Sequence, residues 1–151
     1  MPRLALFVLL ACAAMPSTLL AKSLSTAHAA DVEAVRAAVL DYVEGLYEVA
    51  PNRIERSVHE KLAKVGWKRD AQGTYREFPR TYEQLLEGAR RYNRDGQIPV
   101  DALKEITIYE VLDKTASVKL TAEWGIDYMH LVKLDGKWMI RNVLWQGHPS
   151  E

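Results

Sequence analysis

An alternating segment near the C-terminus constrains the fold of this chain more than any other part of the sequence. Residues 127–145 read DYMHLVKLDGKWMIRNVLW, with an Asp135-Gly136 pair between two runs in which apolar and polar residues alternate. An Asp-Gly pair between such runs is the strongest short-range indication of a tight two-residue hairpin. Both faces of the predicted hairpin carry large apolar side chains, so we expect both faces to be covered.

The pattern along the rest of the chain predicts an α+β fold. Apolar residues recur at helical spacing over residues 31–48, and further helices are predicted from Asn52 to about Lys64 and from Thr81 to about Arg94. Residues 65–68 and 74–78 resemble a small β-hairpin, and residues 106–111 and 117–124 alternate as strands do. Helices followed by four antiparallel strands indicate a sheet with helices over one face.

Composition and motifs exclude several classes of function. The 151 residues carry 20 basic and 20 acidic side chains, a balance that lacks the cationic surplus needed to bind nucleic acid. The sequence contains no glycine-rich phosphate loop and no Gly-x-Ser-x-Gly nucleophile motif. Beyond the first 29 residues its histidines are widely spaced and no cysteine remains. We therefore predict neither a metal site nor a cofactor.

The first 29 residues have the features of a cleaved signal peptide. Arg3 precedes an apolar run from Leu4 to Met15, and Ala27-His28-Ala29 provides a small-residue cleavage site. We expect residues 30–151 to form a single exported domain, periplasmic or secreted, with no membrane association in the mature form. Residues 9–12, Leu-Leu-Ala-Cys, loosely resemble a bacterial lipobox, so lipidation at Cys12 is the alternative to ordinary cleavage.

Three segments together resemble a known family. The segments are the Tyr128-x-His-Leu-Val-Lys-x-Asp-Gly-Lys-Trp-x-Ile hairpin and the stretches 40–47 and 53–59. They are similar to the nuclear transport factor 2-like superfamily, in particular the group labelled "putative lumazine-binding", over residues 31–146. The resemblance implies a cystatin-like cone, in which a curved antiparallel or mixed sheet wraps around the N-terminal helices and leaves a pocket at its open end. Members include isomerases, dehydratases and non-catalytic binders, so the fold alone does not choose a function.

The predicted hairpin register divides its residues between two faces. With a two-residue loop, Leu134 pairs with Lys137 and the pairing continues outward. The face expected to point into the cone carries Asp127, Met129, Leu131, Lys133, Trp138, Ile140, Asn142 and Leu144. Asp127 and Asn142 are polar groups on this apolar face and are candidate pocket residues. The alternative is that both bond backbone groups at a strand end.

The opposite face of the hairpin predicts an interface. An apolar patch rimmed by charge commonly marks a contact surface, and members of this superfamily often dimerise through their sheets. We therefore predict a homodimer that forms through the sheet. Its candidate interface residues are Tyr128, His130, Val132, Met139, Arg141, Val143 and Trp145.

Aromatic residues complete the candidate pocket. Trp67, Tyr75, Tyr82 and Trp124 are expected to line or cover the mouth of the cone, with core packing as the alternative for each. We predict a non-catalytic binder of a small hydrophobic or aromatic molecule, such as a pterin-like or flavin-like ligand. One alternative is a cofactor-free isomerase or lyase with Asp127 as general base and Tyr42, Tyr82 or Tyr109 as proton donor. Another is an assembly module whose cone is filled.

Overall fold

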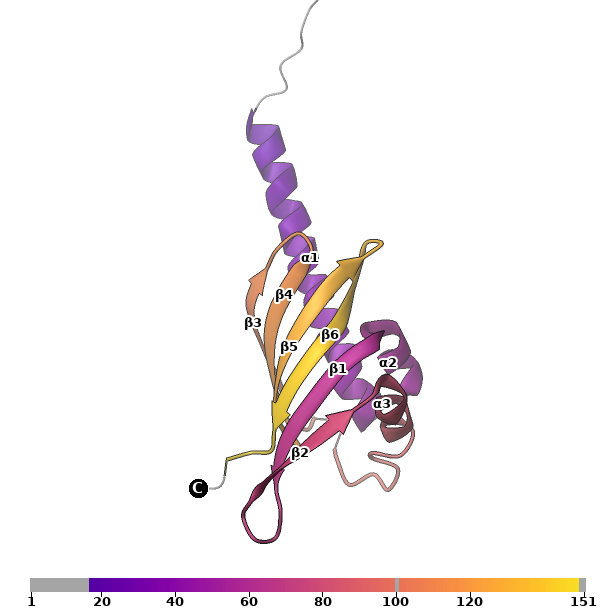
Figure 1. Ribbon diagram of the computed structural model, residues 1–151. Coiled ribbons are helices and arrows are strands. Elements are labelled where there is room, and N and C mark those ends of the chain that lie inside the picture. The colour runs from indigo at the N-terminus through magenta and orange to yellow at the C-terminus, as the bar shows by residue number, and fades with distance from the viewer. Residues whose placement is uncertain (1–16, 100, 150–151) are drawn as a thin grey trace, which may run out of the picture.

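The computed structural model describes residues 17–99 and 101–149, which form an α+β domain (Figure 1). Its helices are α1 (Ser17–Tyr47), α2 (Pro51–Ser57) and α3 (Tyr82–Ala89). Its strands are β1 (Val58–Arg69), β2 (Tyr75–Arg80), β3 (Lys104–Val111), β4 (Thr115–Ala122), β5 (Gly125–Leu134) and β6 (Lys137–Gln146). The predicted fold class is confirmed.

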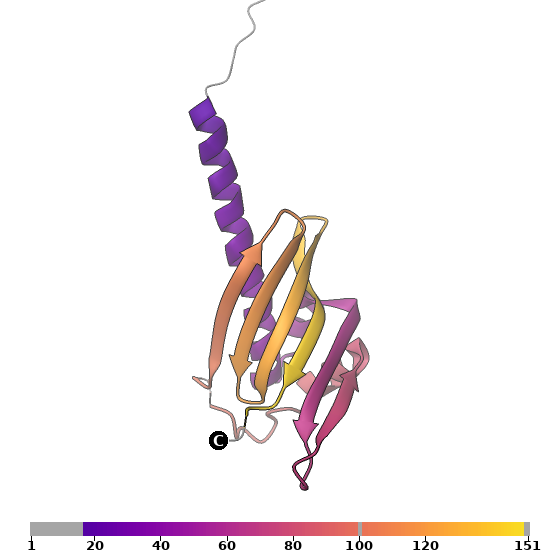
Figure 2. The same cartoon turned by 60° about the vertical axis from the view of Figure 1, so that its left-hand side comes forward.

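The strands form one curved, mixed sheet with the order β2-β1-β6-β5-β4-β3. Strand β1 runs parallel to β6, and all other neighbours are antiparallel. Figures 1 and 2 show α1 crossing behind the sheet, with α2 and α3 beside β1 and β2. The helices therefore cover one face of the sheet.

Helix α1 supplies one half of the hydrophobic core. The predicted stripe is confirmed: Val35, Val39 and Val43 are completely buried, and Val32 packs against the core from its edge. Their partners are inward-facing residues of the sheet, including Leu120, Met129, Leu131 and Ile140. Helical spacing on one element and alternation on the others thus place apolar side chains on facing surfaces.

The second predicted helix is wrong beyond its first two turns. Helix α2 ends at Ser57, and β1 begins at Val58 instead of the helix continuing to Lys64. Residues 58–69 pair in parallel with β6 on one side and in antiparallel with β2 on the other. These backbone partners lie far away in the sequence and override local helical spacing. Helix α3 is also shorter than predicted, ending at Ala89.

The hairpin between β5 and β6 has the predicted turn and half of the predicted register. Asp135 and Gly136 both have positive φ, as a type I′ turn requires, and Leu134 pairs with Lys137. The register then shifts between His130 and Leu131, where Arg141 is an extra residue on β6. Such a β-bulge turns later side chains of its strand to the opposite face. Asp127 consequently pairs with Trp145, and the predicted pairing of Asp127 with Leu144 is wrong.

The predicted signal peptide is only partly covered by the structure. Residues 1–16, which include Cys12, lie outside the described residues. Helix α1 runs continuously from Ser17 through the predicted cleavage site at Ala29. None of the helices in the described residues is both long and apolar enough to cross a membrane.

Candidate functional site

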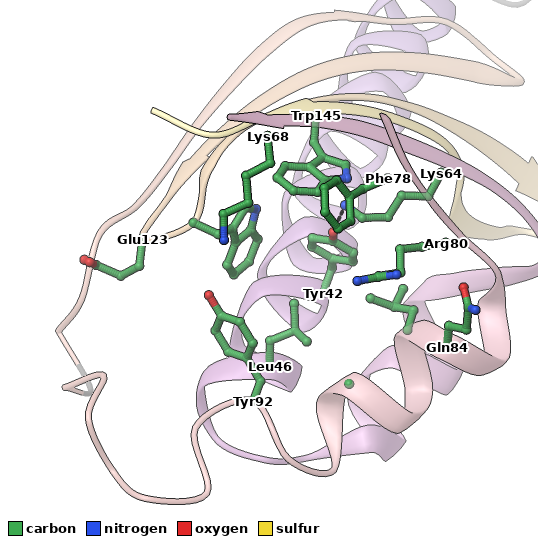
Figure 3. A pocket seen from close by; sticks show the side chains of 13 residues that line it. Tyr42, Leu46, Lys64, Lys68, Phe78, Arg80, Gln84, Tyr92, Glu123 and Trp145 are labelled. Carbon is green, nitrogen blue, oxygen red and sulfur yellow. Dashed lines mark hydrogen bonds between the residues drawn. The ribbon is translucent and has the colours of Figure 1, made fainter. Parts of the chain in front are cut away.

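A cavity of about 580 Å³ opens between the projecting end of the sheet and the helices. Strands β1, β2 and β6 form one wall, α1 and α3 form the others, and the turn after β4 contributes Glu123 and Trp124 (Figure 3). The lining residues are Tyr42, Leu46, Lys64, Lys68, Phe78, Arg80, Gln84, Leu85, Gly88, Tyr92, Glu123, Trp124 and Trp145. Aromatic rings and cationic side chains therefore dominate its walls.

A network of polar contacts lies directly behind the cavity wall. Asp127 is completely buried, and its Oδ2 accepts a hydrogen bond of 3.0 Å from the Tyr42 hydroxyl and forms an ion pair with Lys64 Nζ at 3.6 Å. Its Oδ1 accepts a hydrogen bond of 3.2 Å from Trp124 Nε1. Lys64 Nζ also donates to the Tyr42 hydroxyl at 2.7 Å. The carboxylate thus holds three cavity-lining side chains in place and does not line the cavity itself.

Burial changes the protonation equilibria of this network. Desolvation lowers the pKa of Lys64, while the neighbouring Asp127 carboxylate opposes that effect. Desolvation, together with the same carboxylate, raises the pKa of Tyr42 well above its ordinary value. Tyr42 therefore keeps its proton at neutral pH and remains a donor to Asp127.

A cluster of aromatic rings forms one side of the cavity. The Trp124 indole makes edge-to-face contacts with the rings of Tyr42, Tyr47 and Tyr92, at centroid distances of 6.0, 5.6 and 5.7 Å. Such contacts hold large rings in fixed orientations. The Tyr47 hydroxyl donates to Leu103 O and accepts from Glu123 N, which anchors the turn that carries Trp124. This wall is therefore rigid as well as apolar.

Trp145 of β6 also lines the cavity. A Cβ atom on Gly66 of β1 would lie 1.8 Å from the Trp145 indole, so the ring rests directly on the glycine backbone. The Trp145 Nε1 atom is buried and has no hydrogen-bond partner among the described residues. Lys64 Nζ lies 5.5 Å from the centre of the same ring. The wall thus combines a flat apolar surface with a nearby cation.

The structure brings few of the predicted pocket residues together. Trp124 lines the cavity, and Asp127 lies behind it in contact with Tyr42, one of the three donors that the sequence suggested. Trp67 and Tyr75 do not line it, because alternation turns them to the face of β1 and β2 opposite the one that carries the cavity-lining Lys68 and Phe78. Tyr82 packs against the core from its edge. Asn142 is exposed on the outer face of the sheet.

The bulge at Arg141 also divides the predicted interface residues between the two faces of the sheet. Tyr128, His130, Val132 and Met139 lie on the outer face as predicted. The predicted outer position is wrong for Val143, which is only 2% exposed in the core, and for Trp145, which lines the cavity. Leu144 occupies the outer face instead and is 51% exposed. Arg141 itself donates to the backbone carbonyl of Lys61 on β1.

Sequence reasoning missed the cationic side of the cavity. Lys64 lies at the end of the segment predicted as a helix, and Lys68 and Arg80 lie on a small hairpin whose place in the sheet was not predicted. A usable indication was present in the alternation of Lys64, Gly66 and Lys68, which fits a strand with one cationic face. The partner strand of that face, however, is set by tertiary structure.

Comparison with solved structures identifies the fold. A nuclear transport factor 2-like protein of unknown function from Silicibacter pomeroyi is 15% identical, with a TM-score of 0.59 over 82% of this chain and 98% of its own. A protein with a cystatin-like fold from Novosphingobium aromaticivorans is 10% identical, with a TM-score of 0.60 over 90% and 92% of the two chains. A third structure, described as "Putative Scytalone Dehydratase" and from the same organism, is 14% identical, with a TM-score of 0.55 over 89% of each chain. These similarities show a shared nuclear transport factor 2-like fold.

Comparison of sequences identifies the family. No match was found among curated proteins. Residues 30–146 match the protein family described as "Putative lumazine-binding", which agrees with the resemblance of the hairpin and of the first helices. Since the match spans most of the sequence and the fold is that of the superfamily, the chain belongs to the "Putative lumazine-binding" family.

Proposed function

We propose that this protein binds a flat, aromatic small molecule in the cavity lined by Trp124 and Trp145, and that it does so without catalysis. The observation that carries the proposal is an open cavity of about 580 Å³ whose lining includes five aromatic side chains, those of Tyr42, Phe78, Tyr92, Trp124 and Trp145. Figure 3 shows several of these side chains around the cavity. Ligand sites are typically clefts of ~300–1,000 Å³ with apolar walls and a few polar groups. Pterin-like and flavin-like molecules have the flat shape that such walls accommodate.

The position of Asp127 supports binding over catalysis. Both carboxylate oxygens accept hydrogen bonds from side chains of the wall, and the residue has no exposed surface. A general base must come within hydrogen-bond distance of the proton that it removes. In this arrangement Asp127 orients Tyr42 and Trp124 and balances the charge of Lys64.

Export and dimer formation are part of the same proposal. The signal-like sequence of residues 1–29 supports export, and the first completely buried side chain of the described residues is Val35, after the predicted cleavage site. The outer sheet face supports a homodimer, because Tyr128 and Leu144 expose apolar surface on neighbouring strands. Exposed apolar patches of this kind commonly mark an interface.

The experiment is a thermal-shift screen with pterins, flavins and other planar aromatic compounds, followed by fluorescence titration of each hit. We expect a bound compound to raise the unfolding midpoint and to quench tryptophan emission, because Trp124 and Trp145 line the cavity. Trp67→Phe should preserve the quenching, since Trp67 lies outside the cavity.

A cavity-filling variant locates the binding site. Gly88 on α3 lines the cavity, and a Cβ atom added there would meet nothing within 4 Å. Gly88→Phe should abolish binding while the protein stays folded, and Gly88→Ala should retain binding. A screen without a single saturable hit, or hits that Gly88→Phe does not weaken, would refute the proposal.

A second candidate function is acid–base catalysis in the same cavity. It is favoured by the continuous chain of contacts from Asp127 through the Tyr42 hydroxyl to the Lys64 amine, whose last two members line the cavity. Tyr42 and Lys64 would then exchange protons with the ligand, with Asp127 behind them. Mass spectrometry of each bound compound after prolonged incubation distinguishes the two functions, because a binder returns the compound unchanged.

A further inference from the structure

Strands β1 and β2 present an unusual concentration of positive charge to the cavity. In their antiparallel register Lys64 pairs with Arg80, Gly66 with Phe78 and Lys68 with Arg76. Alternation along each strand places all six of these residues on one face. Lys64, Lys68 and Arg80 line the cavity from that face, together with the ring of Phe78.

Only one of these three cations has an acidic partner in the described residues. Lys64 is paired with Asp127 at 3.6 Å. The side chain of Lys68 has neither a hydrogen bond nor an ion pair with any described residue. Arg80 donates a long hydrogen bond of 3.5 Å to the carbonyl of Pro79, and its guanidinium lies 5.8 Å from the centre of the Phe78 ring. The charges of Lys68 and Arg80 are therefore not neutralised, and this side of the cavity carries a surplus of positive charge.

The one acidic residue among those that line the cavity does not remove this surplus. Glu123 Oε1 accepts a hydrogen bond of 3.0 Å from the backbone N–H of Leu103. Figure 3 shows its carboxylate directed away from the cavity, whereas Lys68 and Arg80 extend toward the space from different sides. The Glu123 carboxylate thus binds the loop before β3 and does not neutralise Lys68 or Arg80.

The pairing of like charges is itself unfavourable for the β1–β2 ribbon. Directly opposed like charges on neighbouring strands destabilise a sheet, and here two such pairs follow each other. Arg76 is compensated by Asp70, with Arg76 Nε 2.9 Å from a carboxylate oxygen. In the Lys64–Arg80 pair, Asp127 neutralises Lys64, and no carboxylate of the described residues neutralises Arg80. An anion at the mouth would relieve the remaining repulsion and would gain charge-assisted hydrogen bonds.

We propose that the cavity selects planar aromatic anions, with the ring against its aromatic lining and the acidic group in contact with Lys68 or Arg80. The acidic group is a carboxylate, sulfonate, phosphate or ionised heterocycle. This inference rests on the proposed binding function and adds the charge of the ligand to it. Surface cations of this kind contribute mainly to selectivity between charged and neutral ligands of the same shape.

The test compares two fluorescent probes that share one ring system. The probes are 1-anilinonaphthalene-8-sulfonate, which is an anion, and N-phenyl-1-naphthylamine, which is its neutral counterpart. We expect the anion to bind the purified protein about tenfold more tightly at low salt. Raising the ionic strength should weaken binding of the anion and leave binding of the neutral probe unchanged.

Charge-removing variants assign the effect to the two cations. Lys68→Gln and Arg80→Gln should each lower the affinity for the anionic probe about fivefold, which is the effect expected of one partly solvated charge. Neither substitution should change the affinity for the neutral probe. Arg69→Gln is the matched control, because Arg69 is next to Lys68 on the opposite face of β1. Gly88→Phe should block both probes.

The outcomes separate the two proposals. Equal affinities of the two probes, with both blocked by Gly88→Phe, would overturn the charge selectivity and leave the binding function standing. Equal weakening of both probes by Lys68→Gln and Arg80→Gln would also overturn it. Binding of neither probe, or binding that Gly88→Phe leaves intact, would overturn both proposals.

Discussion

Tyr42 on α1 donates a hydrogen bond of 3.0 Å to Asp127 on β5, a residue 85 positions away in the sequence. The bond joins the central helix to the middle of the sheet directly behind the cavity. It also lies next to Lys64, which contacts both groups. The network therefore couples the stability of the fold to the shape of the candidate binding site.

Replacement of Asp127 should strongly destabilise the protein. Asp127→Ala leaves the Lys64 ammonium buried without its partner, and breaking a buried pair in this way costs about 3–5 kcal/mol. Urea unfolding followed by circular dichroism measures the loss. Lys64→Met in the Asp127→Ala background should recover part of the stability, since it removes the uncompensated charge. A single variant as stable as the wild type would show that the pair is dispensable.

Gly66 should not tolerate even alanine. The added Cβ would lie 1.8 Å from the Trp145 indole, so the ring must leave its position on the cavity wall. We expect a destabilisation of about 1–3 kcal/mol from overpacking. A change in tryptophan emission should accompany it.

Gly88→Ala should have the opposite effect on stability from Gly66→Ala. Its Cβ meets nothing within 4 Å, and Gly88 lies within helix α3. Alanine should therefore stabilise the protein by about 0.5–1 kcal/mol. Thermal unfolding of both variants gives the comparison, and an unperturbed Gly66→Ala protein would contradict the described contact with Trp145.

The protein should lose stability as the pH rises from about 10 to about 12. Burial raises the pKa of Tyr47 from 10.0 to about 12, so the folded protein keeps a proton that the unfolded chain releases in this range. The stabilising contribution of Tyr47 is complete below pH 10 and lost by pH 12. A pKa difference of this size corresponds to about 2–3 kcal/mol, and solvent screening around the partly desolvated hydroxyl reduces the expected contribution to about 1–2 kcal/mol.

The variant Tyr47→Phe isolates this contribution from those of Tyr42 and Lys64. Its unfolding free energy, measured by urea at several pH values, should decline less across that range than the wild-type value does. Tyr109→Phe is the matched control, because the Tyr109 side chain is 57% exposed. Identical alkaline profiles for the wild type and Tyr47→Phe would show that Tyr47 does not contribute.

Light scattering after size-exclusion chromatography should detect a dimer at micromolar concentration. The variant Leu144→Asp should convert it to a monomer without unfolding, because Leu144 lies on the outer face and is not part of the core. Lys104→Gln on the edge strand β3 offers a control away from the patch. A wild-type protein that elutes only as a monomer would rule out the predicted interface.

The hairpin shows how far sequence reasoning extends. The Asp135-Gly136 turn and the pairing from Leu134 to Leu131 follow from the turn type and from alternation, and both are confirmed. Beyond that point, the extra residue at Arg141 reverses every later position on β6. The predicted inner position of Asp127 is correct because it lies on β5, where alternation is uninterrupted. The predicted positions of Asn142 and Trp145 are wrong because both follow the bulge.

The sequence by itself determined the α+β class, the buried stripe of α1, the turn of the hairpin and the inward direction of Asp127. These features depend on local periodicity and turn chemistry, which neighbouring residues encode. Only the tertiary structure decided that residues 58–64 belong to a strand instead of a helix, and that Trp145, Lys68 and Arg80 line the cavity. These outcomes depend on β1 pairing with β6 and β2, and no local pattern specifies which distant strand supplies the hydrogen bonds.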